Sequence, residues 1–191
     1  MATLRFEIEN YEKIRRQLGG EIVEKALAMA LQRVAMKART TASKEVRQVY
    51  NIKARDMGRA VRPRRIRHGG ATVAYMLEYT GKRLGLDKFG ARQVKVRSKK
   101  GPRRGVSVQI RKDRPRFVFK GGFGADIHGL KVFTRKTSAR LPIRRRYSMS
   151  VPEMLRRAEV MDDVLARVRR ETPIEFDRAM KITIDRAIRR L

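Results

Sequence analysis

The sequence of 191 residues contains no cysteine and only two histidines, His68 and His128. The absence of cysteine excludes disulfide bonds and thiolate chemistry. A metal site needs several His, Cys or carboxylate ligands close together, so two histidines in different contexts predict no metal site. They also give no basis for a Ser/His/Asp arrangement. We therefore assign no catalytic residue, expect no cofactor and do not expect an enzyme.

Long apolar runs are missing as well. No stretch approaches the roughly 18 apolar residues of a membrane span. The first seven residues, MATLRFE, lack the charged-then-apolar order of a signal peptide. We expect a soluble protein that is made inside a cell and has no membrane partner.

Acidic residues are scarce, because 19 Asp and Glu stand against 49 Lys and Arg and the formal net charge is +30. Self-repulsion on this scale opposes compaction unless a polyanion or bound counterions offset it. The apolar fraction of 41% is nevertheless enough for the core of one domain. Nucleic acid is therefore the first partner to consider.

The positive charge is concentrated in the middle of the chain. Residues 1–52 contain 10 basic and 6 acidic residues, and residues 148–191 contain 10 and 8. Residues 53–147 contain 29 basic and 5 acidic residues. The two ends have the mixed charge of helices that pack as a scaffold, whereas the middle has the charge of a contact surface.

Helical periodicity marks the N-terminal part. From Glu21 to about Val49, apolar residues recur at spacings of three and four, which predicts one long helix with a buried stripe. A shorter helix is predicted from about Ala54 to Val61, ending before Pro63.

The stretch from Ala71 to Ser150 has the composition of a central antiparallel β-sheet with basic hairpin loops. Residues 72–79, 94–97, 106–110 and 117–119 are rich in β-formers and several alternate with polar residues. Gly101-Pro102 lies between two basic pairs, which predicts a hairpin tip that carries four cations.

The C-terminal part predicts two helical pieces. Ser150-Val151-Pro152-Glu153 has the spacing of a capping box, and Thr172-Pro173-Ile174-Glu175 repeats it. We expect a kink or a restart of the helix near Pro173. The apolar residues expected on the buried side of the last piece are Ile174, Met180, Ile184, Ala187, Ile188 and Leu191.

Together these patterns predict a single α+β domain over residues 1–191. Its parts are a helical segment at 1–67, a basic β-rich segment at 68–150 and the C-terminal helices at 151–191.

Two short motifs are not interpreted as binding sites. Lys120-Gly121-Gly122-Phe123-Gly124 lacks the spacing and context of a phosphate-binding loop and is interpreted as a flexible connection. Asp162-Asp163 is interpreted as part of a solvated helix face, because neighbours on a helix diverge.

A basic run is usually a solvated face, but here the excess is too large for that interpretation alone. Aromatic residues make up only 6%, and no zinc finger, RNP pattern or basic zipper is present. Contact with phosphates, or with acidic partners, is therefore favoured over base reading. The candidate contact residues are Arg62, Arg64, Arg65, Arg67, Lys99, Lys100, Arg103, Arg104, Arg144, Arg145 and Arg146. If Arg144-Arg145-Arg146 lie on a strand, alternation places the middle one on the opposite face.

Three passages resemble a known family. They are ALAMALQRVA at 26–35 with Ala42 to Val46 after it, the short basic segment from Ile52 to Arg67, and Leu141-Pro142-Ile143 through Ser150-Val151-Pro152. Their order and spacing are similar to those of the minor tail protein Z, or tail completion, proteins of lambda-like tailed phages and prophages. Residues 80–116 match that family only in being basic.

The resemblance implies a virion component at the head-proximal end of a long tail, assembled in the host cytoplasm. It also implies a homo-oligomeric ring, most simply a hexamer, next to the tail terminator and connector proteins, with the tape-measure protein and the phage DNA as further neighbours. Helical ends would then assemble the ring, and basic loops would face the DNA or acidic partners.

Two alternatives remain open. A free non-specific nucleic-acid-binding protein, of ribosomal or nucleoid-associated type, fits the charge equally well. A small nuclease or toxin would use the same surface to hold its substrate, but the missing cluster of His and carboxylates argues against it.

Overall fold

The computed structural model describes residues 20–58, 61–68, 71–97, 103–126, 130–137 and 139–189. It has the α+β fold class that the sequence predicts. The elements in chain order are α2 (Gly20–Val49), α3 (Ala54–Gly58), β1 (Val61–His68), β2 (Ala71–Tyr79), the 3-10 helix η1 (Leu86–Lys88), β3 (Arg92–Val96), β4 (Arg103–Val108), β5 (Phe117–Lys120), β6 (Gly122–Asp126), β7 (Leu130–Arg135), β8 (Ile143–Arg145), α4 (Val151–Leu155) and α5 (Ala158–Ile188).

The chain divides into two compact units, which are described separately below. The first unit consists of residues 1–42, 61–79 and 161–191, and the second of residues 43–60 and 80–160.

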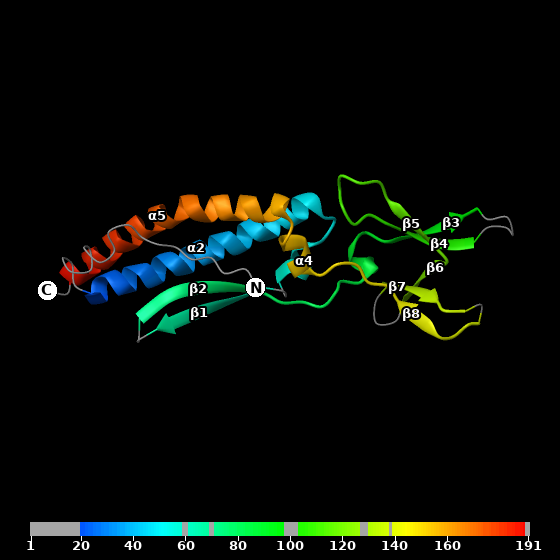
Figure 1. Cartoon of the computed structure of the whole chain (residues 1–191), viewed down its shortest axis with the longest axis horizontal. Helices are drawn as coiled ribbons and strands as arrows, with labels where there is room; N and C mark the ends of the chain where they lie inside the picture. Colours follow the sequence, from blue (N-terminus) through cyan, green and yellow to red (C-terminus); the bar gives the residue numbers. More distant parts are fainter. Residues whose placement is uncertain are drawn as a thin grey trace. The chain divides into compact units, whose positions relative to one another are not determined.

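In the first unit, α2 and α5 pack side by side (Figure 1). Their shared core is formed by Val23, Ala26 and Ala30 on α2 with Phe176, Ala179 and Met180 on α5, so most of its residues are small and the two large side chains come from α5. The stripe predicted for the first helix is confirmed, because Val34 and Ala38 are buried as well. The small side chains let the helices approach closely, and the large ones supply the buried apolar area.

The buried side of α5 was predicted only in part. Met180 is buried as expected, but Ile174 and Ile188 are 49% and 62% exposed. The buried positions between them are Phe176, Ala179 and Thr183. The sequence pattern was ambiguous because apolar residues occur on two faces of this helix.

A group of charged side chains joins the same two helices. Lys37 Nζ on α2 donates hydrogen bonds to Glu171 Oε2 and Glu175 Oε1 on α5, each at 2.6 Å. Glu175 is only 1% exposed, and Arg33 and Arg178 also lie near it, at 3.6 and 3.1 Å. The hydrogen bonds from Lys37 hold the pKa of both carboxyl groups below their usual range, and the same bonds raise the pKa of Lys37.

Pro173 does not restart the helix, so this alternative is wrong. The helix α5 runs without interruption from Ala158 to Ile188, with Pro173 inside it, and its ribbon bends in its middle part in Figure 1. The Thr172 hydroxyl donates to the carbonyl of Val168 at 2.8 Å instead of capping a new helix, and Glu175 is engaged by Lys37. The break lies earlier, at residues 156–157.

The first capping box is confirmed. The Ser150 side chain accepts from the Glu153 backbone N–H, and the Glu153 carboxylate accepts from the Ser150 N–H at 2.6 Å. The two bonds give hydrogen-bond partners to the backbone N–H groups of Ser150 and Glu153 at the start of α4.

Residues 61–68, which fall mostly within the segment expected to be helical, form strand β1 instead. β1 pairs with β2 in an antiparallel two-stranded sheet, with a register shift between Ile66 and Arg67. Pro63 is tolerated because both strands are edges, so its missing N–H removes no interior ladder bond. At the end of β2, burial raises the pKa of Tyr79 to about 12.

The second unit contains two three-stranded antiparallel sheets, with orders β3-β4-β5 and β6-β7-β8. The strands predicted near residues 94–97, 106–110 and 117–119 correspond to β3, β4 and β5. The expected pairing of the hairpin is confirmed, because Val96 pairs with Arg103 on either side of its tip. Val106 and Val108 on β4 form a core with Val132 on β7 and Leu86.

The segment from Lys120 to Gly124 is not a flexible connection. Lys120 ends β5, Gly122 begins β6, and Gly121 between them has a φ of +75°. Glycine adopts this angle without the steric cost that a Cβ would bring. One residue thus carries the chain from the first sheet into the second.

Phe176→Ala tests the packing of α2 against α5. Loss of this buried ring should lower the free energy of unfolding by about 3–5 kcal/mol. Ile174→Ala, on the exposed side of the same helix, should cost about 0.5 kcal/mol or less. Urea denaturation followed by circular dichroism measures both, and equal losses would contradict the assigned face.

The Lys37 group predicts an acid-dependent part of the stability. Because the folded-state pKa values of Glu171 and Glu175 are depressed, their contribution is present above the usual value of 4.5 and is lost as the pH falls through the folded-state values. Lys37 also stabilises the fold, but with the opposite pH dependence, because its folded-state pKa is raised. Its contribution is lost only as the pH rises past a value above 10.5. The melting temperature of Glu171→Gln/Glu175→Gln should therefore lie several degrees below that of the unaltered chain at neutral pH, and the two should converge at acidic pH. Asp163→Asn, an exposed change on the same helix, is the control and should lower the melting temperature at neutral pH by less than the double variant does.

Candidate polyanion contact surface

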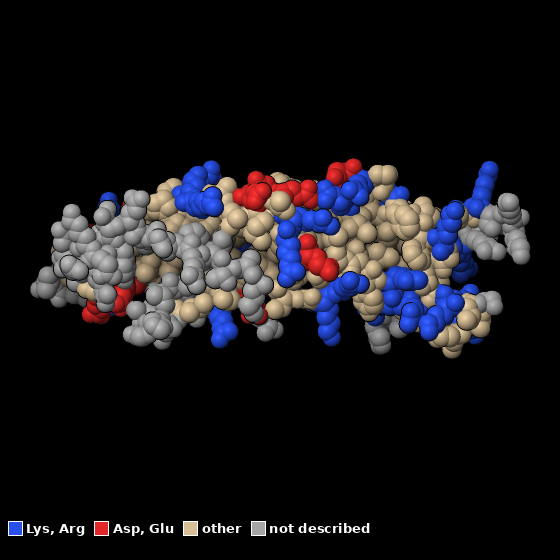
Figure 2. All heavy atoms as spheres, in the orientation of Figure 1, with Lys and Arg blue, Asp and Glu red and all other residues tan. Residues whose placement is uncertain are grey.

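The second unit carries most of the positive charge. It contains 29 Lys and Arg and 7 Asp and Glu, whereas the first contains 20 and 12. On the face drawn in Figure 2, Lys and Arg atoms gather over the part of this unit that contains β3 to β8. The location of its few carboxylates therefore decides where positive charge is left uncompensated.

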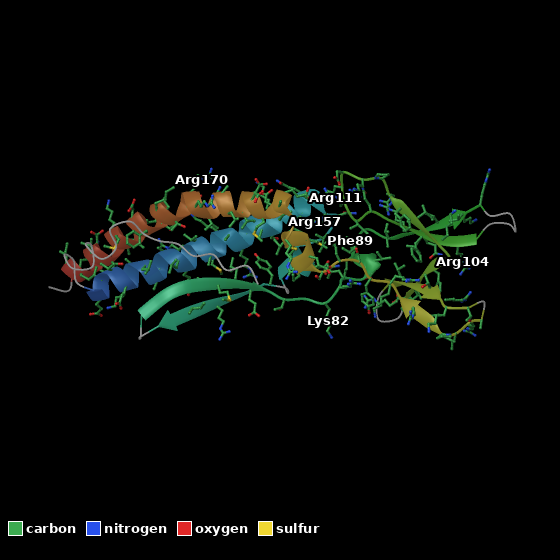
Figure 3. All side chains as sticks on the ribbon, viewed as in Figure 1. Lys82, Phe89, Arg104, Arg111, Arg157 and Arg170 are labelled. Carbon is green, nitrogen blue, oxygen red and sulfur yellow. The ribbon has the colours of Figure 1, made fainter. Side chains whose placement is uncertain are left out.

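Two of these carboxylates are held by Arg111, which is labelled in Figure 3. Arg111 Nε donates to Asp113 Oδ1 at 2.9 Å, and Nη1 donates to Glu159 Oε1 at 2.7 Å. Its guanidinium also lies 5.6 Å from the centre of the Tyr50 ring. The hydrogen bonds to Asp113 and Glu159 raise the pKa of Arg111 and hold the pKa of both carboxyl groups below their usual range.

Three further carboxylates have internal partners. Asp56 lies 3.2 Å from Lys88 Nζ, and Asp87 accepts from Arg145 Nη2 at 3.1 Å. Glu153 caps α4, and the hydrogen bond from the Ser150 backbone lowers its pKa. Five of the seven acidic residues of this unit are thus engaged in contacts that stabilise its own fold.

Uncompensated cations meet on the hairpin of β3 and β4. Lys95 lies directly opposite Arg104 in the antiparallel register, and both side chains are exposed. Like charges at directly opposite positions destabilise a sheet. Within the described ranges neither side chain has a carboxylate at salt-bridge distance, so this pair is a place where a bound anion would remove a repulsion.

The predicted cations of the hairpin are only partly visible. Lys99 and Lys100 lie outside the described residues, and so does the side chain of Arg103, whose backbone begins β4. Of the four predicted contact residues of this hairpin, Arg104 is the one whose side chain the structure describes. It is exposed and is labelled in Figure 3.

The three consecutive arginines have different roles. Arg144 on β8 is exposed, whereas Arg145 is half-buried and bonded to Asp87, so the predicted alternation is confirmed. Arg146 Nε donates to Thr134 Oγ1 at 2.8 Å, and its guanidinium lies 5.1 Å from the centre of the Phe119 ring. Arg144 and Arg146 are both exposed, but Arg146 also has partners within the unit, so Arg144 is the one of the three whose side chain has no partner in the described part of the chain.

The four arginines between positions 62 and 67 belong to the other unit. They lie on β1, where Arg62 pairs with Glu78 and Arg64 with Met76. The side chain of Arg64 is exposed, and those of Arg62, Arg65 and Arg67 lie outside what the structure describes.

Several exposed cations of the second unit were not singled out from the sequence. Arg92 and Lys95 on β3 and Lys120 at the end of β5 are exposed. Strand alternation around Val94 and Val96 was the signal that could have found Lys95. Arg116, by contrast, is internal, because its guanidinium donates to Ser107 Oγ and to the carbonyls of Ser107 and Gly90.

In the described part of the chain, no group of three or more His, Cys, Asp or Glu side chains lies close enough to hold a metal ion. Asp162 and Asp163 are both exposed on α5. His128 lies outside the described residues. Among the helices that are described, none is long and apolar enough to cross a membrane.

No protein-family model, no curated protein and no solved structure matches this chain.

Lys95→Glu tests the repulsion on the hairpin. It replaces a like-charge pair by an opposite-charge pair with Arg104, so the melting temperature at low salt should rise by about 1–4 °C. Lys82→Glu, in an exposed loop of the same unit, makes the same change in net charge and is the control. The difference between the two variants should shrink at high salt, because exposed charges are screened. An equal shift in both would mean that net charge alone is responsible.

Proposed function

We propose that this chain is a non-enzymatic structural protein whose basic β-rich unit lies against a polyanion, double-stranded DNA in the first place. The observation that carries the proposal is the distribution of partners in the second unit. Five of its seven carboxylates have partners within the unit, while Lys95, Arg104 and Arg144 remain exposed. A phosphate backbone supplies the negative charge that such a surface lacks.

The setting proposed for this contact is the head-proximal end of a phage tail. The three passages that resemble tail completion proteins support it, together with the location of Ser150-Val151-Pro152 at a true helix start. In this setting the chain forms a ring with further copies, docks on tail terminator and connector proteins and surrounds the path of the DNA. The exposed cations then neutralise phosphates without reading bases.

A salt series tests the DNA contact. Changing Lys99, Lys100, Arg103 and Arg104 to Gln should weaken binding to a labelled duplex and reduce the slope of log affinity against log salt by about 3 to 4. Fluorescence anisotropy measures both quantities.

The matched control removes four exposed cations from α5 and the residue just after it: Arg169, Lys181, Arg186 and Arg189, each changed to Gln. This variant should keep the slope of the unaltered chain. If both quadruple variants lost the same amount, binding would follow total charge, and a specific basic surface would be contradicted.

The phage setting has a separate test. Mass spectrometry of purified virions should detect the chain in a small, fixed number of copies per particle. Recovery only with ribosomes or with bulk chromosome would contradict the tail setting and support a free nucleic-acid-binding protein.

A further inference from the structure

A groove of about 650 Å³ opens in the second unit, and none of the candidate contact residues lines it. Three arginines line it, Arg83, Arg156 and Arg157, together with Tyr147, Ser148 and Glu153. Arg157 is labelled in Figure 3. A volume of this size is typical of a site for a small ligand or one unit of a polymer.

Backbone pairing holds the walls of the groove in place. The Ser148 N–H donates to the Leu84 carbonyl at 2.7 Å, and the Leu84 N–H donates to the Met149 carbonyl at 3.2 Å. These bonds fix Arg83 beside the segment that carries Tyr147. Arg156 and Arg157 lie at the break between α4 and α5, and the Arg156 N–H donates to the Pro152 carbonyl at 3.1 Å.

The groove has an excess of positive charge. Its carboxylate, Glu153, accepts the Ser150 N–H and is already used as a helix cap. Arg83 and Arg156 help to lower the pKa of this carboxyl group, although the Ser150 backbone bond has the largest effect. Three guanidinium groups against one carboxylate leave two positive charges uncompensated. Guanidinium groups bind phosphate through paired N–H donors.

Tyr147 gives the groove an aromatic surface that is held in orientation. Its side chain is 52% exposed. The Arg145 guanidinium lies 5.2 Å from the centre of its ring, and Arg145 is itself bonded to Asp87 at 3.1 Å. The bond to Asp87 thus fixes the arginine that supports the ring. An exposed aromatic ring beside phosphate-binding groups is the arrangement with which proteins stack an unpaired base.

We propose that this groove binds one nucleotide unit of single-stranded nucleic acid, with its phosphate held by Arg83, Arg156 and Arg157 and its base stacked on Tyr147. The inference rests on the proposed polyanion contact and adds a preference to it, because a base paired within a duplex cannot stack on a side chain. A free phosphate or an acidic peptide would use the arginines but would not need the ring.

Anisotropy titrations of the full chain test the two halves of the site separately. The probes are a labelled short oligothymidylate, an abasic oligonucleotide of the same length and a duplex with the same number of phosphates. Tyr147→Leu should weaken oligothymidylate binding about tenfold and leave binding of the abasic strand unchanged. Tyr147→Phe should retain the affinity of the unaltered chain.

Arg83→Gln/Arg156→Gln/Arg157→Gln should weaken both single strands and reduce the salt slope by about 2. Arg92→Gln/Lys95→Gln/Arg104→Gln removes the same charge from β3 and β4 and is the control, which should lose less oligothymidylate affinity than the groove variant. If the control lost as much or more, or if Tyr147→Leu affected the abasic strand equally, the groove proposal would be overturned and the polyanion contact would stand. If no probe bound the unaltered chain, both proposals would fail.

A measurement on the unaltered chain avoids any folding defect of the variants. Ultraviolet crosslinking to an oligonucleotide containing 4-thiothymidine, followed by peptide mapping, should place the crosslink on Tyr147 or its neighbours. Crosslinks confined to other segments would overturn the assignment.

Discussion

Mutual repulsion among the cations of the second unit is the constraint on which its structure depends. The unit is small, it has few carboxylates, and each ion pair that it forms internally removes a compensating charge from its surface. Arg111 binds two carboxylates, and Arg145 binds a third. The fold is thereby stabilised by contacts within the unit. The exposed strands are left with facing cations such as Lys95 and Arg104, which makes an external polyanion the natural complement.

The first unit has a smaller excess of positive charge, with 20 Lys and Arg against 12 Asp and Glu. Lys37 joins α2 to α5 through two carboxylates, of which one, Glu175, is almost fully buried. Elsewhere the contact between the two helices is apolar, with Phe176 and Met180 packed against small residues of α2. A pair of helices with these properties is suited to structural support, and the proposed polyanion contact is assigned to the basic unit.

Local signals in the sequence predicted the elements that depend on local physics. The long stripe of α2, the capping box at Ser150 and the hairpin of β3 and β4 all follow from periodicity, side-chain caps and turn residues. The predicted restart of the helix at Pro173 was wrong because tertiary packing keeps the helix continuous across this residue. Glu175 is held there by Lys37, which lies far away in the sequence. The strand β1 was missed because Pro63 was used only to mark the end of a helix, although an edge strand tolerates proline. For the candidate site, the sequence predicted only that its charge is positive and that it lies in the middle part of the chain. Which arginines have partners within the unit depends on residues such as Asp87 and Thr134, which lie elsewhere in the sequence. The groove combines residues 83, 147 and 157, which no sequence spacing connects.

The central claim is that exposed cations of the β-rich unit contact a polyanion while those of the helical unit do not. Acetylation rates of individual lysines, measured by mass spectrometry with and without duplex DNA, test it most directly. The account predicts that DNA slows acetylation of Lys95 and Lys120 severalfold and leaves Lys25 and Lys181 unchanged. Equal protection of all four lysines, or protection of the helical pair alone, would contradict it.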